Sequence, residues 1–267
     1  MTNHAYLMDN PDEARRLDLK TTAPPLERQA RWAGIAPGMR VADVGCGSGK
    51  TSRFLHRLVD GGEVVGIDAS AERIAHARAE HSAPGLTFTC RDFYAPLDDL
   101  GSFDFIWVRF VLEYHRAHSR DIVANLLRLL KPGGILCLID LDHNCLSHFG
   151  MPPRLERALD GVMQHLTAEH DFDPYAGRKL YSYLYDTGCS DIQVDLTHHH
   201  LIYGALGAVD DYNWSQKVEV AARTSGYDFP DYPGGFPEFR EEFASFFADP
   251  RRFTYTPLIC CSGRAPR

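Results

Sequence analysis

The sequence lacks a long apolar run. None of its 267 residues lies in a hydrophobic stretch of the roughly 20 residues that are needed to cross a bilayer. The opening segment, MTNHAYLMDNPDEARR, also lacks the basic-then-apolar pattern of a secretory signal. Apolar residues make up 44% of the chain and charged residues 24%, which is ordinary for a globular protein. Together these features predict a cytoplasmic protein with no membrane partner.

A basic cluster is also absent. The chain has 28 Lys and Arg against 36 Asp and Glu, which gives a net charge of −8. Its densest basic pairs, Arg15-Arg16 and Arg251-Arg252, are too short to form a basic face. Because proteins that bind nucleic acids usually carry such a face, we expect no nucleic-acid partner. The sequence leaves the oligomeric state open, a homodimer included.

Cysteines at metal or disulfide spacing are missing as well. The chain has 7 cysteines, an odd number, and no CxxC pair, so neither a disulfide framework nor a thiolate zinc site is predicted. Three consecutive histidines, His198–His200, invite a metal interpretation, but successive side chains of a strand point to opposite faces. We therefore expect a surface or interface strand there, and no metal ion.

Short apolar segments alternate with helical patterns along the first half of the chain. This alternation is typical of a parallel sheet with helices on both faces. The expected strands are residues 38–45, 63–70, 86–93, 103–110 and 135–142; the expected helices between them are 52–59, 71–81 and 121–130, the last ended by residues 131–134. Two further helices precede them, one beginning at Asn10 and Pro11 and one over about residues 25–33.

The pattern changes after about residue 141. A helix over residues 152–170 does not fit a simple strand-to-strand crossover, and strands are expected at 191–202 and 253–265. The Phe- and Tyr-rich segment 227–255 indicates core and lid packing. A platform for stacking nucleobases is disfavoured there by the acidic charge of the chain.

The glycine-rich segment VADVGCGSGKT, residues 41–51, follows the first expected strand. It does not fit an ATPase phosphate loop, which needs a glycine where this chain has Val44. It fits a dinucleotide loop only in part, because the third glycine, Gly49, comes one residue early. A third interpretation is a loop for S-adenosylmethionine, whose cationic groups favour the carboxylate of Asp43 close to the glycines.

The segment VADVGCGSG resembles the first motif of class I S-adenosylmethionine-dependent methyltransferases. Three further motifs follow in order over about residues 38–140: an acid ending the second strand, RDF after the third, and LLKPGGIL before the fifth. The resemblance implies an α/β, Rossmann-like sheet, mostly parallel with an antiparallel last strand, and methyl transfer to a small molecule. The cofactor contacts that we expect are made by Asp43, Gly45, Cys46, Gly47, Gly49, Asp68, Ala69, Asp92, Phe93 and Arg109.

Individual roles follow from the same resemblance. Asp68 is expected to accept hydrogen bonds from the ribose hydroxyls, and Asp92 from the adenine amino group, with Phe93 beside the ring. Arg109 has two alternatives: it pairs with the carboxylate of the cofactor, or it pairs with Glu113.

The opening segment YLMDNPDEARRLDLKT, residues 6–21, resembles the N-terminal segment of small-molecule methyltransferases such as those of quinone biosynthesis. This implies a helical lid over residues 1–34, with Tyr6 in contact with the cofactor, ahead of a catalytic domain over residues 35–267. A second lid segment is expected as an insertion at about residues 141–175.

A general base for the acceptor is expected where the fourth and fifth strands end. His143 is the first candidate, because the ordinary pKa of a histidine allows it to accept a proton near neutral pH. The alternative is that His143 caps the lid helix or bonds to Asp142; Glu113 and His148 are weaker candidates. A nicotinamide-dependent dehydrogenase and a non-catalytic cofactor-binding protein are the two rival functions.

Overall fold

The computed structural model describes residues 23–266. Within this range eight strands form one sheet in the order β3-β2-β1-β4-β5-β8-β6, and β7 also pairs with β8. The strands are β1 (Arg40–Val44), β2 (Glu63–Asp68), β3 (Leu86–Cys90), β4 (Phe103–Arg109), β5 (Leu130–Leu141), β6 (His148–Phe149), β7 (Ser190–Tyr203) and β8 (Phe253–Arg264). The helices are α2 (Ala23–Ala33), α3 (Lys50–Leu58), α4 (Ala71–His81), α5 (Ser119–Leu127), α6 (Pro153–Glu169), α7 (Leu180–Asp186), α8 (Ala208–Ser225) and α9 (Gly235–Ala248).

The sheet has the direction pattern that the sequence predicts. Strands β1 to β5 are mutually parallel, with β1 between β2 and β4. The last strand, β8, is antiparallel to β5 and to β7. The parallel strands carry Val, Ile, Leu and Phe side chains on both faces of the sheet. Both faces are therefore buried. The predicted Rossmann-like fold class is therefore confirmed.

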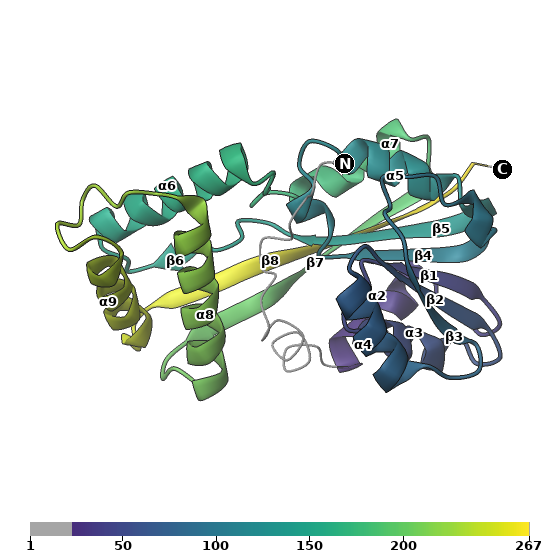
Figure 1. Cartoon of the computed structure of the whole chain (residues 1–267), viewed down its shortest axis with the longest axis horizontal. Helices are drawn as coiled ribbons and strands as arrows, with labels where there is room; N and C mark the ends of the chain where they lie inside the picture. Colours follow the sequence, from purple (N-terminus) through teal and green to yellow (C-terminus); the bar gives the residue numbers. More distant parts are fainter. Residues whose placement is uncertain (1–22, 267) are drawn as a thin grey trace.

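Helices cover both faces of this sheet (Figure 1). Apolar residues of α2, α3 and α4 pack with one face of the sheet into a single buried cluster. Apolar residues of α5 and α7 pack with the other face into a second cluster. The resulting three layers leave the carboxyl ends of β1 to β5 at one edge of the sheet, which is where ligands bind in open α/β folds.

A second group of elements extends from that edge and forms the left half of the molecule in Figure 1. It consists of α6, α8, α9, β6 and the adjoining ends of β7 and β8, and we refer to it as the helical lobe. Its interior is a third hydrophobic cluster that includes Trp214, Phe239, Phe243 and Phe247. The aromatic-rich segment of the sequence thus packs as the core of this lobe, as predicted.

The boundary between α5 and β5 differs most from the prediction. The sequence predicts that residues 131–134 end the helix before the fifth strand, but α5 already ends at Leu127 and β5 begins at Leu130. The register between β4 and β5 shifts between Phe103 and Phe105, so the Pro-Gly-Gly segment is accommodated as an irregularity within β5.

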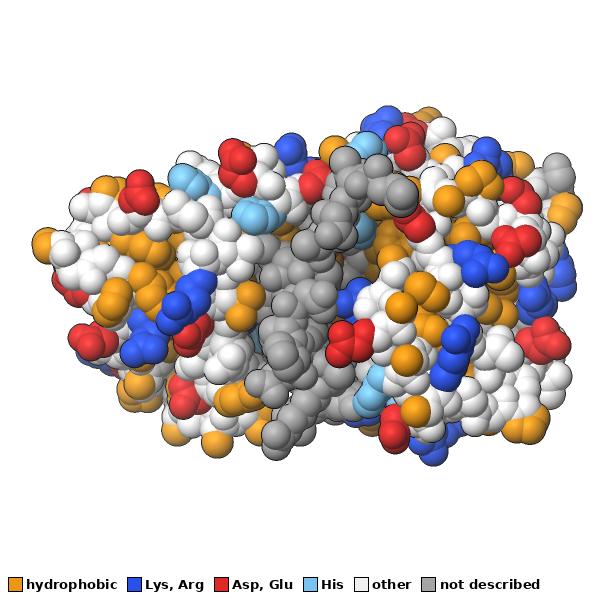
Figure 2. Space-filling view, in the orientation of Figure 1, with side chains coloured by type: hydrophobic (Ala, Val, Ile, Leu, Met, Phe, Trp, Pro, Cys, Tyr) orange, Lys and Arg blue, Asp and Glu red, His pale blue; other side chains and the backbone are white. Residues whose placement is uncertain are grey.

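Charged side chains are mixed over the surface. On the face drawn in Figure 2, acidic, basic and histidine side chains are interspersed over both halves of the molecule. Among residues 23–266, no helix combines the length and the apolarity that crossing a membrane would require.

Candidate active site

The glycine loop lies directly after β1, at the carboxyl edge of the sheet. Gly45, Gly47 and Gly49 have φ values of 72°, 54° and 85°, a left-handed region that residues with a Cβ rarely adopt. At Gly45 the approach is also close, since a Cβ there would lie 2.3 Å from Cγ2 of Val111. The glycines therefore allow this loop to pass tightly beneath the segment that follows β4.

Asp43 is buried in β1 just before this loop. Its Oδ2 accepts a hydrogen bond of 2.6 Å from the hydroxyl of Ser52 on α3. Burial raises the pKa of Asp43 to about 7; the Ser52 bond opposes this rise, the charge of Asp68 adds to it, and the charge of Arg109 opposes it. Asp43 thus ties the loop to α3 and also places a titratable carboxyl group beside Arg109. The small side chain of Cys46 is buried in the same loop.

Asp68 ends β2 and fixes the loop from the other side. Its Oδ2 accepts the backbone N–H of Gly47 at 2.9 Å. Its Oδ1 accepts the backbone N–H of Ser70 at 2.9 Å and two guanidinium N–H groups of Arg73, at 3.2 and 3.0 Å. Both oxygens of the expected ribose acceptor therefore already have partners within the chain. Ala69, which follows it, is exposed.

Asp92 and Phe93 follow the neighbouring strand β3. Because Asp68 is in register with Cys90, the two predicted acids extend from adjacent strand ends. Asp92 is exposed, and its Oδ1 accepts the backbone N–H of Tyr94 at 2.9 Å. Phe93 is buried, with its ring edge-to-face against His115.

Arg109 at the end of β4 lies between two acids. Burial lowers the pKa of its guanidinium to about 10, while the charges of Asp43 and Asp140 oppose this decrease. The guanidinium carbon lies 3.9 Å from the centre of the Phe110 ring, and Nε is buried with no hydrogen-bond partner among residues 23–266. The charge of Glu113 also acts on this guanidinium, without an ion pair between the two side chains in the same range, and both alternatives for Arg109 stay predictions.

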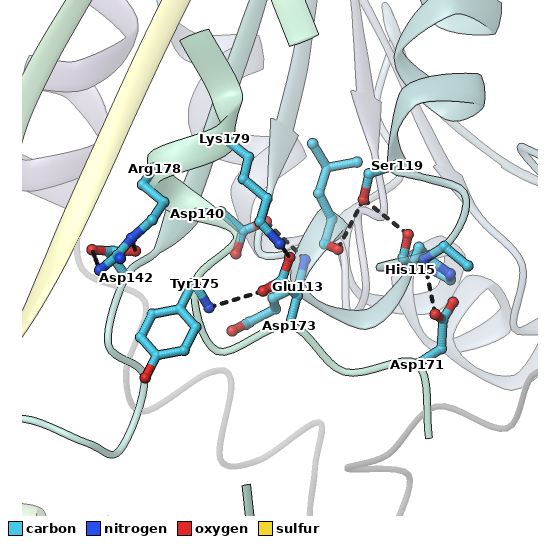
Figure 3. Close-up of polar contacts among 12 residues, drawn as sticks. Glu113, His115, Ser119, Asp140, Asp142, Asp171, Asp173, Tyr175, Arg178 and Lys179 are labelled. Atoms are coloured by element: carbon cyan, nitrogen blue, oxygen red, sulfur yellow. Dashed lines mark hydrogen bonds and ion pairs between the residues drawn. The ribbon is translucent and has the colours of Figure 1, made fainter. Parts of the chain in front are cut away.

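Beyond β5 the chain forms a buried polar cluster (Figure 3). Asp140 accepts the backbone N–H groups of Glu113 and Leu141, each at 3.1 Å. Burial, together with the charge of Glu113, raises the pKa of Asp140 well above its ordinary range. Asn144 then donates its Nδ2–H to Oε2 of Glu113 at 2.7 Å. This cluster joins the ends of β4 and β5.

His143 lies at the outer side of this cluster, with its side chain 42% exposed. Its Nε2 accepts a hydrogen bond of 2.7 Å from Arg178, which in turn binds both carboxylate oxygens of Asp142 at 2.8 and 2.9 Å. The His143 ring meets the ring of Tyr175 edge-to-face. Nε2 and the Asp142 carboxylate are 3.9 Å apart, so His143 bonds to the partner of Asp142 and not to Asp142 itself. Nε2 must therefore release Arg178 before it can accept a proton from a substrate.

The two other histidine predictions differ in their outcome. His148 lies inside the helical lobe, where Thr254 and the carbonyl of Cys145 bond to its two ring nitrogens. Burial lowers its pKa to about 4, which keeps it neutral. The sequence predicts a surface or interface strand at His198–His200. Strand β7 forms there, with His198 exposed and with His200 buried and bonded to Thr256. A register shift between His198 and His200 turns that ring inward against α8.

Several polar residues around the cluster were not predicted. Arg178 and Lys179 come from the short turn before α7, and Lys179 pairs with the buried Asp173. Lys217 comes from α8 and donates a hydrogen bond to Oδ1 of Asn144. The sequence carries no motif for these residues, because only the fold brings them to the end of β5.

The predicted lid residues 1–22, Tyr6 included, lie outside the described residues. Among residues 23–266 no group of three His, Cys, Asp or Glu side chains is arranged to hold a metal ion.

Residues 41–134 match the family profile described as a methyltransferase domain. Over these residues the chain is similar to methyltransferases. Trans-aconitate 2-methyltransferase of Deinococcus radiodurans is 29% identical over 82% of this chain and 84% of its own length. A ubiquinone biosynthesis O-methyltransferase of Bradyrhizobium is 34% identical over 44% of this chain. The alignment covers 46% of that enzyme.

Solved structures share the fold of this chain. Phosphoethanolamine N-methyltransferase 2 of Haemonchus contortus superposes with a TM-score of 0.59 at 14% identity, over 100% of this chain and 61% of its own. YcgJ of Bacillus subtilis superposes with a TM-score of 0.57 at 18% identity, over 91% of this chain and 98% of its own. The sequence similarities support S-adenosylmethionine-dependent methylation of a small molecule and give no support to the dehydrogenase or the non-catalytic alternative.

Proposed function

We propose that this protein transfers the methyl group of S-adenosylmethionine to a small molecule in the cytoplasm and releases S-adenosylhomocysteine. The observation that carries the proposal is that the glycine loop, Asp68, Asp92 and Arg109 meet at the carboxyl edge of one parallel sheet. Ligands of open α/β sheets bind at this edge.

The described residues fit the cofactor. Arg109 offers a buried guanidinium whose Nε has no partner among residues 23–266, which suits the carboxylate of the amino-acid half. Asp68 and Asp92 offer carboxylate oxygens at adjacent strand ends for the ribose and the adenine amino group. The glycine loop, with Cys46 and the neighbouring Ala69, lets the backbone approach the ligand closely. For Asp68, the ribose must share or displace the Arg73 contact.

When bound, the cofactor supplies an electrophilic methyl group on a sulfonium. The task of the protein is then to hold an acceptor atom in line with this group and to exclude water. The helical lobe is the element that we propose as part of the lid, together with the segment before α2. Although α2 belongs to the predicted lid over residues 1–34, it packs into the core on one face of the sheet. For a hydroxyl acceptor, His143 is the proposed base, with Nε2 freed from Arg178.

Turnover of the His143→Ala variant tests this base once an acceptor is known. We expect turnover to fall by about 10²- to 10⁴-fold, with S-adenosylhomocysteine affinity near wild type. His170→Ala, which removes an exposed histidine at the end of α6, is the matched control. Full turnover in His143→Ala would remove His143 from the mechanism.

Thermal unfolding tests the cofactor. S-adenosylhomocysteine should raise the melting temperature, because a ligand that binds only the folded state adds RT ln(1 + [L]/Kd) to its stability. Asp68→Ala should strongly reduce this increase, since hydrogen bonds to a charged acceptor contribute about 1.5–3 kcal/mol. The control is Asp99→Ala, which removes an exposed carboxylate from the turn between β3 and β4. Stabilisation by NAD and not by S-adenosylhomocysteine would overturn the proposed function.

A further inference from the structure

Lys217 extends from the helical lobe to the carboxyl edge of the sheet. It lies on α8, one turn after Trp214, so both side chains share one face of the helix. Its ammonium donates a hydrogen bond to Oδ1 of Asn144, in the loop after β5, and Asn144 in turn bonds to Glu113. This places the charge of Lys217 beside the ends of β4 and β5, where a methyl acceptor has to approach the cofactor.

The charge of Lys217 has no counter-charge among the residues that the structure describes. Within residues 23–266 no acid lies at ion-pair distance from Lys217, although the side chain is partly buried. The neighbouring cations differ: Arg178 pairs with Asp142, and Lys179 pairs with Asp173. A partly buried ammonium that bonds only to a neutral amide oxygen is unfavourable unless an anion completes its surroundings.

The indole N–H of Trp214 is a further hydrogen-bond donor that no described residue uses. Trp214 is only 1% exposed, and its Nε1–H has no hydrogen-bond acceptor among the described residues. The Lys217 ammonium lies 5.4 Å from the centre of this ring. An ammonium has three N–H donors, of which Asn144 uses one. Lys217 and Trp214 together therefore offer a positive charge and spare donors, the combination that a carboxylate with two acceptor oxygens requires.

We infer that the methyl acceptor carries a carboxylate group, and that Lys217 and the Trp214 N–H bind it. This inference rests on the proposed function and adds the chemical class of the acceptor. The carboxylate completes the ion pair that Lys217 lacks and orients the acceptor toward the edge of the sheet. No covalent change occurs at this subsite.

Fractionation of a small-molecule cell extract tests the class of acceptor without a prior guess. The extract is separated on an anion exchanger, and each fraction is incubated with the protein and with S-adenosylmethionine labelled in the methyl group. We expect label in a small molecule of the retained fraction, and we expect this to survive prior treatment of the fraction with alkaline phosphatase. Label only in the unretained fraction, label in neither, or label lost after phosphatase treatment overturns the carboxylate assignment.

Variants then test the subsite with the labelled fraction as substrate. Lys217→Met should raise the apparent KM by about 10- to 100-fold, the loss expected for one charge-assisted hydrogen bond, with a smaller change in kcat. Lys217→Arg should recover part of this loss, and Trp214→Phe, which keeps an aromatic ring but removes the N–H, should raise KM alone. Arg223→Met on the same helix removes an exposed cation paired with Glu219 and serves as the control.

The melting temperature with S-adenosylhomocysteine separates the two proposals. If S-adenosylhomocysteine stabilises the wild type and Lys217→Met equally, the cofactor site is intact and any change in KM belongs to the acceptor. If S-adenosylhomocysteine does not stabilise the wild type, the proposed function itself fails. If it does, but Lys217→Met keeps the wild-type KM, only the acceptor subsite is overturned.

Discussion

Asp43 couples the stability of the fold to pH. Its pKa rises from 3.8 to about 7 on folding, so between these values it is protonated in the folded chain and ionised in the unfolded chain. The free energy of unfolding therefore decreases as pH rises from about 4 to about 7, and this contribution is constant above that range. Asp43→Asn cannot ionise, so its free energy of unfolding should not show this decrease. The difference in unfolding free energy, variant minus wild type, should therefore be about 1–3 kcal/mol larger at pH 8 than at pH 5.

Urea unfolding of both proteins at the two pH values measures this difference. Ser52→Ala is a useful companion variant, because it removes the hydrogen bond to Asp43 and leaves the carboxyl group in place. An advantage of Asp43→Asn that is equal at both pH values would contradict the assignment.

Gly45 is confined by its backbone and by a neighbour. Gly45→Ala places a methyl group at a φ of +72° and 2.3 Å from Val111, which should cost about 2–4 kcal/mol through strain and overpacking. Gly38→Ala has a similar φ of +77° but nothing within 4 Å of the new Cβ, so it should cost only about 1 kcal/mol.

Chemical denaturation of the two variants gives the comparison. The double variant Gly45→Ala, Val111→Ala should recover part of the Gly45→Ala loss, because it removes the side chain that the new Cβ meets. Equal losses at Gly45 and Gly38 would show that the contact with Val111 is unimportant.

At the scale of single residues, the sequence predicts those that belong to contiguous motifs. Asp43, the loop glycines and Asp68 are close in sequence, and their positions follow from strand ends and turn geometry. Lys217 and Trp214 could not be predicted, because no local pattern marks them and they reach the end of β5 only through the packing of the helical lobe.

The helices of the helical lobe have a core of their own. Phe239 on α9 is fully buried and packs against Phe229, Tyr232 and Phe243. Phe239→Ala should reduce stability by about 3–5 kcal/mol, the usual cost of truncating a buried aromatic side chain. Because this cluster is separate from the two clusters of the sheet, amide exchange should accelerate first in α6, α8 and α9.

The control for this prediction is Phe149→Ala on β6. Its side chain is 72% exposed, so the substitution should change stability little. If Phe239→Ala instead speeds exchange uniformly across β1 to β5, the two halves of the molecule unfold as one unit.

At the scale of elements, the sequence predicts secondary structure correctly where strand patterns and helix patterns follow one another. It fails where one segment carries both a strand signal and a turn signal. The five parallel strands have apolar segments that end at turn signals, and all five are present in the predicted order. The segment before residue 135 was assigned to a helix end, yet the residues from Leu130 onward extend β5 because pairing with β4 outweighs the local turn signal. The inward turn of His200 depends on a register shift that the amino-acid sequence does not mark.

For the whole molecule, the prediction concerns the N-terminal segment. We expect residues 1–24 to order over the bound cofactor and to limit access to it, as lids commonly do. Amide exchange followed by mass spectrometry, with and without S-adenosylhomocysteine, measures this directly. Peptides from residues 1–24 should gain protection with the ligand, whereas peptides from α9, remote from the glycine loop, should not change. Identical exchange of the N-terminal peptides in both conditions would rule out the lid.

The pairing of β7 with β8 sets the way in which the two halves of the molecule can move. The ladder runs from Ser190 and Arg264 to Tyr203 and Phe253, but β5 accompanies β8 only as far as Leu141 and Leu258. Beyond that point a narrow β-ribbon connects the sheet with the helical lobe (Figure 1). Bending such a ribbon in its own plane stretches its ladder hydrogen bonds, whereas twisting follows its natural coiling. Twisting of this ribbon therefore changes the position of α8 relative to the end of β5, to which Lys217 is tied through Asn144.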